Sequence, residues 1–116
     1  NGLRSIEVIF ESEAVVIGRR GASSSQNRST LVTMLQSVIE ARKSRYLLFN
    51  VPTQHLAEVV AELPTSGSPS VLTLANPEVV SVHALVPASD IWALMPKLEA
   101  KGASAILTLP IERMVR

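Results

Sequence analysis

Residues 46–63, YLLFNVPTQHLAEVVAEL, carry a strand pattern that leads directly into a helix pattern. The run at residues 45–50 is short, apolar and aromatic, which is typical of a buried strand. Pro52 suits the first turn of a helix, where its missing N–H is not needed, and Pro64 ends the segment. Between the prolines, four aliphatic residues at helical spacing define one apolar face: Leu56, Val59, Val60 and Leu63.

The same alternation of elements continues to residue 109. Residues 70–75 and 79–86 are strand candidates separated by an Asn76-Pro77 turn. A second apolar helical face follows (Ile91, Leu94, Met95 and Leu98), and Gly102 is a suitable end for that helix. Pro96 lies inside the pattern and predicts a kink or a shifted boundary.

The last strand, within KGASAILTLPI, starts with small residues, which suits either close packing or a pocket. The order strand, helix, strand, strand, helix, strand predicts a ferredoxin-like βαββαβ unit of the α+β class, with both helices on one face of the sheet.

The chain before residue 44 has a different pattern. Residues 5–19 alternate like a β-hairpin, residues 18–29 are small, polar and basic like a loop, and residues 30–43 have helical spacing. We therefore divide the chain into a first part, residues 1–43, and a ferredoxin-like domain, residues 44–116. A lone hairpin is only marginally stable in water, so this one requires a partner from another copy or from the helix, or it stays unfolded.

The strands carry apolar residues on both parities, although two helices can cover only one face. Tyr46 and Leu48 oppose Leu47 and Phe49, and a similar opposition runs through residues 79–86. A large exposed apolar patch usually marks an interface. The pattern predicts that a second subunit or domain covers the other face, unless these residues lie at strand ends under loops.

Composition excludes several classes of function. The net charge of the 116 residues is +1 with both signs interspersed, which argues against a nucleic-acid partner. No apolar run approaches the roughly 18 residues that span a membrane, and no secretory leader is visible. The absence of cysteine excludes disulfides and thiolate metal sites and agrees with a cytoplasmic location.

The candidate chemical groups are few. His55 lies near Glu58 and Glu62 at helical spacing, which could bind a metal but fits a solvated helix face better. His83 in mid-strand suits a hydrogen-bonded interfacial histidine better than a catalytic one. No nucleophile or phosphate-loop motif appears, so we predict neither catalytic nor metal-binding residues. Small residues at strand ends fit either tight turns or a small zwitterionic ligand: Asn50, Ser68, Ser70, Ala103, Ser104 and Ala105.

Three segments in order, SPSVLTLA, HALVP and GASAILTLPIERM, resemble the C-terminal regulatory domain of long-form ATP phosphoribosyltransferase. This resemblance implies a part in the first step of histidine biosynthesis, with L-histidine as the feedback ligand and a trimer of regulatory domains within a homo-hexamer. By position, it implies histidine contacts at Asn50, Ser70, Leu85 and Ala105. Asn50 stands where the family often has an aspartate, which removes a charge from the site that would hold the ligand's ammonium group.

The beginning of the chain, NGLRSIEVIFESEAVVI, resembles the end of the family's catalytic region. Asn1 and Gly2 then correspond to the last residues of a phosphate-binding loop. We therefore expect no catalytic activity and no cofactor in this chain, the magnesium being required by the parent enzyme. The alternatives are a structural oligomerisation module without ligand binding and a stand-alone small-molecule sensor.

Overall fold

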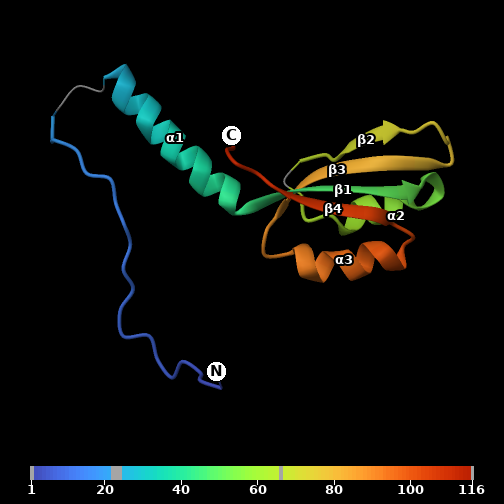
Figure 1. Cartoon of the computed structure of the whole chain (residues 1–116), viewed down its shortest axis with the longest axis horizontal. Helices are drawn as coiled ribbons and strands as arrows, with labels where there is room; N and C mark the ends of the chain where they lie inside the picture. Colours follow the sequence, from blue (N-terminus) through green and yellow to red (C-terminus); the bar gives the residue numbers. More distant parts are fainter. Residues whose placement is uncertain (1, 22–24, 66, 116) are drawn as a thin grey trace.

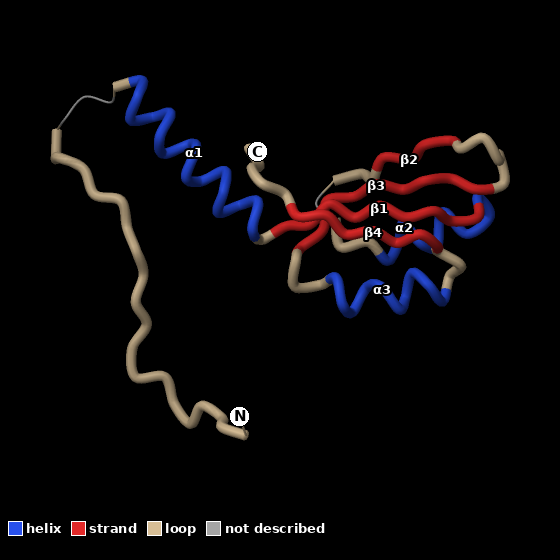
Figure 2. The backbone as a smooth tube through the Cα atoms, in the orientation of Figure 1, coloured by secondary structure: helices blue, strands red, loops and turns tan. Residues whose placement is uncertain are grey.

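The computed structural model describes residues 2–21, 25–65 and 67–115. Its elements follow the predicted order from residue 44 onward, after one long helix (Figures 1 and 2). They are α1 (Gln26–Arg42), β1 (Ser44–Pro52), η1 (Thr53–His55), α2 (Leu56–Glu62), β2 (Ser70–Thr73), β3 (Val79–Pro87), α3 (Ile91–Ala100) and β4 (Ser104–Pro110).

The four strands form one antiparallel sheet in the order β2-β3-β1-β4. Both α2 and α3 lie on the same side of this sheet (Figure 1). These features confirm the ferredoxin-like α+β prediction.

The core lies between the sheet and the two helices. Strand parity decides which side chains enter it, because Leu47, Phe49 and Val51 of β1 are buried while Tyr46 and Leu48 are not. The residues that pack against these β1 side chains come from alternate positions of β3 and from one face of each helix. Together they form a single cluster: Val80, Val82, Ala84, Val86, Val59, Leu63, Ile91, Leu94 and Leu98. Burying each such side chain stabilises the fold by about 1.5–3 kcal/mol.

Helix α3 continues through Pro96 instead of stopping there. Pro96 cannot donate to the carbonyl of Trp92, but both residues are exposed, so water can satisfy that carbonyl. The helix ends at a glycine with φ +84°, and the N–H groups of Gly102 and Ala103 donate to the carbonyls of Glu99 and Leu98 at 2.9 and 3.0 Å. This hydrogen-bond pair is a Schellman motif, and it explains the predicted end at Gly102.

The predicted hairpin at residues 5–19 is not formed. Residues 2–21 contain neither helix nor strand, and every one of them is exposed. Ile6 and Phe10 are 97% and 81% accessible to solvent, so the strand-like side chains contact no sheet. The hairpin prediction was wrong for this chain because two strands without a third strand or a helix to cover them do not bury enough apolar surface.

Helix α1 begins earlier than its apolar pattern predicted, at Gln26 instead of residue 30. The hydroxyl of Ser25 accepts a hydrogen bond from the N–H of Arg28 at 3.3 Å and caps the helix. The helix projects away from the sheet (Figure 1), and within the described part of the chain no helix is long and apolar enough to cross a membrane.

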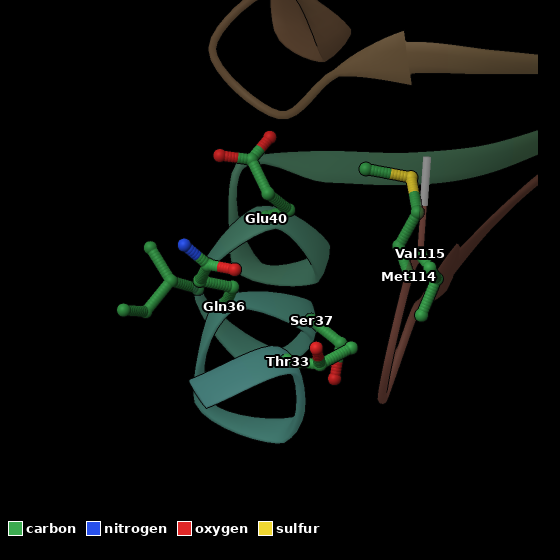
Figure 3. A pocket seen from close by; sticks show the side chains of 7 residues that line it. Thr33, Gln36, Ser37, Glu40, Met114 and Val115 are labelled. Carbon is green, nitrogen blue, oxygen red and sulfur yellow. The ribbon is translucent and has the colours of Figure 1, made fainter. Parts of the chain in front are cut away.

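The C-terminal segment after β4 runs back along α1. The N–H of Met114 donates to the carbonyl of Ser37 at 3.0 Å, and Ser37 and Ala41 are buried at this junction. A cavity of about 320 Å³ lies between the helix and the segment, with Met114 and Val115 on one side and Thr33 and Ser37 on the other (Figure 3). We call residues 111–115 the strap, because they connect β4 to the middle of α1.

Candidate functional site

The four residues that the sequence assigns to a ligand site lie one on each strand. Asn50 is near the end of β1, Ser70 begins β2, Leu85 is on β3 and Ala105 follows the first residue of β4. Because the strand order is β2-β3-β1-β4, Ser70 and Ala105 lie on opposite edges of the sheet. Three strand spacings separate these edges, which is about 14 Å.

The register also separates the four residues along the strands. Asn50 pairs with Ser81 on β3, whereas Leu85 pairs with Tyr46. Leu85 is thus four positions beyond the level of Asn50, about 13 Å at the rise of an antiparallel strand. The structure therefore brings together Asn50 with Ala105 and Ser70 with Leu85, but it does not bring the four together within one chain.

The first pair lies at a β-bulge in β4. Leu48 pairs with Leu107, but Asn50 pairs with Ser104, so β4 has one more residue than β1 in this interval. Ala105 is the extra residue and has φ +49°, in the left-handed region that is unfavourable for an L-amino acid. A bulge leaves the backbone of the extra residue without a ladder partner, so the N–H and carbonyl here can bind another group.

The second pair lies beside a small cavity of about 170 Å³. Leu85 forms one wall, and the chain that leads into β2 forms the other through Thr65, Gly67, Ser68 and Pro69. The hydroxyl of Thr65 donates to the carbonyl of Gly67, which helps to hold this turn. The side chain of Ser70 is exposed and pairs across the strands with His83.

The face of the sheet opposite the helices, which we call the open face, combines apolar side chains with polar ones. Antiparallel partners point to the same side, so the register assigns its members: Tyr46, Leu48, Asn50, Ser70, Leu72, Val79, Ser81, His83, Leu85, Leu107 and Leu109. None of these residues is Asp, Glu, Lys or Arg. Tyr46, Leu72, Leu107 and Leu109 are each at least 40% exposed, which confirms that the strands are apolar on both sides.

His83 is hydrogen-bonded at both ring nitrogens. Its Nδ1 is 2.8 Å from the hydroxyl of Tyr46, and its Nε2 is 3.2 Å from the hydroxyl of Ser81. The Tyr46 and His83 rings meet edge to face with their centroids 5.6 Å apart. The predicted hydrogen bonding of His83 is confirmed. The sequence shows that Ser81 and His83 share a face, but the contact with Tyr46 depends on the register between β1 and β3.

The other candidates have structural roles. His55 contacts the side-chain amide of Gln54 at 3.2 Å, while Glu58 and Glu62 pair with Lys101 at 3.9 and 3.8 Å. Within residues 2–21, 25–65 and 67–115, no three His, Asp or Glu side chains come together as metal ligands.

The resemblance assigns Asn1 and Gly2 to the end of a phosphate-binding loop, and the structure describes only Gly2. Gly2 is exposed, has φ +66° and has open space around its Cα, whereas Asn1 lies outside the described residues.

The βαββαβ order, the helices on one face and the uncharged opposite face define a ferredoxin-like domain with a surface available for a ligand or a partner. A family model described as "HisG, C-terminal domain" matches residues 41–113, and the chain belongs to this family. Residues 41–113 are accordingly the regulatory part of ATP phosphoribosyltransferase, an enzyme of histidine biosynthesis. The match begins at the end of α1 and covers the whole sheet.

Proposed function

We propose that this domain binds L-histidine as a feedback ligand and that the binding site is completed only when copies of the chain associate. One observation supports the proposal: the four residues that the resemblance implies for histidine lie in two pairs toward opposite edges of the sheet, Asn50 with Ala105 and Ser70 with Leu85, and we call these pairs half-sites. A distance of about 14 Å between edges is too long for one amino acid to contact both half-sites in a single chain.

A head-to-tail arrangement brings the half-sites together. If the β2 edge of one copy meets the β4 edge of the next, the Ser70 half-site of the first lies beside the Ala105 half-site of the second. Such heterologous contacts form a closed ring when the rotation permits, and the family resemblance suggests three copies. The helices cover the outer face, so the uncharged open faces would point into the ring and be removed from water.

Each half-site offers groups that suit part of a histidine molecule. The side-chain carbonyl of Asn50 can accept a hydrogen bond from an ammonium group, although without the added strength that a carboxylate would give. The free backbone N–H at the bulge suits a carboxylate, as does the hydroxyl of Ser70. Leu85 and the cavity beside it offer an apolar wall for the imidazole ring.

Calorimetric titration of the chain with L-histidine, together with sedimentation, tests the proposal. We expect binding at millimolar concentration or tighter, and we expect Ser70→Ala to weaken it. Ser89→Ala is the control, because Ser89 is an exposed serine that lies outside the strands and outside the cavity beside Leu85. Absence of binding in an associated chain would favour the alternative, a structural assembly module, for which the loss of charge at Asn50 is the main argument.

The proposal includes no catalysis by this chain. We expect no formation of phosphoribosyl-ATP, because Gly2, the described residue that the resemblance assigns to a phosphate-binding loop, is exposed and has open space around it. A cytoplasmic location accompanies the assignment to a biosynthetic enzyme.

A further inference from the structure

His83 lies near the middle of the open face, on the second strand of the sheet. It pairs with Leu48 of β1 and with Ser70 of β2, and Ser81 and Leu85 flank it along β3. Its side chain is half-buried among these neighbours. His83 is not one of the residues assigned to the half-sites, although it lies beside Ser70 and Leu85. Both of its ring nitrogens already have partners within the chain.

No charged group offsets a positive charge at His83. Across the strands it meets Leu48 and Tyr46 on β1, and Ser70 and Leu72 on β2. Tyr46 is the only other titratable side chain among the described residues that flank it. Arg45, the nearest basic residue on β1, has the opposite parity, and its guanidinium donates to the carbonyls of Arg42 and Ser44.

The hydrogen bonds of His83 are complete when the imidazole is neutral. The hydroxyl of Tyr46 donates to one nitrogen, and the other nitrogen donates to the hydroxyl of Ser81, or the two directions are reversed. A protonated imidazole donates from both nitrogens, so Tyr46 must accept. The phenolic proton then needs a new acceptor, which water provides on an exposed face but not on a covered one.

We propose that His83 makes the self-association dependent on pH: the neutral imidazole permits the open faces to be removed from water inside the ring, and the protonated one opposes it. The inference rests on the proposed self-association. An uncompensated charge in an apolar interface is strongly unfavourable, and in a ring the His83 side chains of all copies would face the same interior. Protons would therefore be taken up when the assembly dissociates.

The sign and the size follow from linkage. Because dissociation takes up protons, association should be stronger at high pH and should weaken as the pH falls. Over the pH range in which one proton per chain binds on dissociation, the affinity falls about tenfold per chain for each pH unit.

The test is sedimentation of the full chain between pH 8 and pH 5.5, with far-UV circular dichroism to confirm that the sheet stays folded. We expect dissociation at the acidic end. His83→Gln keeps hydrogen-bonding groups but cannot become charged, so its association should not respond to pH. His55→Gln is the matched control, because it removes the other histidine, which lies outside the open face, and it should keep the response.

The outcomes separate the two proposals. An associated chain with no pH response, or a response that persists in His83→Gln, overturns the role of His83 and leaves the proposed function intact. A chain that is monomeric at every pH and at high concentration overturns self-association, and the inference with it. If His55→Gln abolishes the response while His83→Gln keeps it, the proton binds at the other histidine and the inference is wrong.

Discussion

Replacing Ala105 by glycine should stabilise the domain, which is unusual for a change to glycine within a strand. Ala105 has φ +49°, and this region is unfavourable for an L-residue by about 1–2 kcal/mol. Glycine removes that strain, but its greater freedom in the unfolded chain costs about 0.5–1 kcal/mol. The difference of the central values predicts an increase in the free energy of unfolding of about 0.75 kcal/mol.

Ala103→Gly is a control two residues away with the opposite expected sign. Ala103 is buried in the core, and its φ is not positive. Losing its methyl group removes about 0.8 kcal/mol of apolar burial, and the flexibility of glycine adds about 0.5–1 kcal/mol. We expect Ala103→Gly to lower the free energy of unfolding by about 1.5 kcal/mol.

Urea denaturation measures both variants, provided that the denaturant dependence stays the same and only the midpoint moves. The two variants should differ by about 2–2.5 kcal/mol, which is about 8–20 °C in Tm for a domain of this size. If Ala105→Gly destabilises the domain as much as Ala103→Gly, then Ala105 does not have a left-handed backbone in solution, and our argument for the bulge fails.

Three further variants test the half-site, the open face and the strap. Ala105→Leu should lower the affinity for L-histidine at least about tenfold. Because the residue is exposed, the free energy of unfolding should change by no more than about 0.5 kcal/mol. The control Ala57→Leu, on the exposed side of α2, should leave calorimetric binding unchanged, and equal binding by both variants would contradict the site. Leu109 is 45% exposed in the single chain, so Leu109→Glu should leave thermal unfolding nearly unchanged. In sedimentation the variant should be monomeric, because the new charge would lie in the covered face. An assembly that tolerates this charge does not use the open face. Met114→Pro removes the N–H that donates to the carbonyl of Ser37. Amide exchange in α1 should therefore accelerate about fivefold, the equivalent of about 1 kcal/mol. Met114→Ala keeps this donor, so the same acceleration in both variants would show that the side chain, not the hydrogen bond, holds the strap.

The order of elements and the parity of the strands were predictable because they depend on local patterns. Leu47 and Phe49 enter the core while Tyr46 and Leu48 do not, as alternation requires. The β-bulge was not predictable, because it is a property of the register between two strands. Position 105 is an alanine and not a glycine, so the sequence does not indicate its positive φ.

The N-terminal hairpin shows a different limit of sequence patterns. Its alternation at residues 5–19 is a good strand pattern, yet the strands need a surface that the described chain does not provide. The division of the four candidate site residues into two pairs also required the register. The sequence indicates that Ser70 and Ala105 are on strands, but only the strand order places them on opposite edges.

The strap gives β4 a mechanical role in addition to its place in the sheet. One end of β4 holds the bulge at Ala105, and the other end continues into the strap, which is hydrogen-bonded to the middle of α1 at Ser37. A bulge sets one extra residue of a strand against its neighbour and leaves that residue unpaired. If the extra residue moved to another position along β4, the strap would shift along α1. A local change of strand register would then change the direction of a helix that projects away from the sheet.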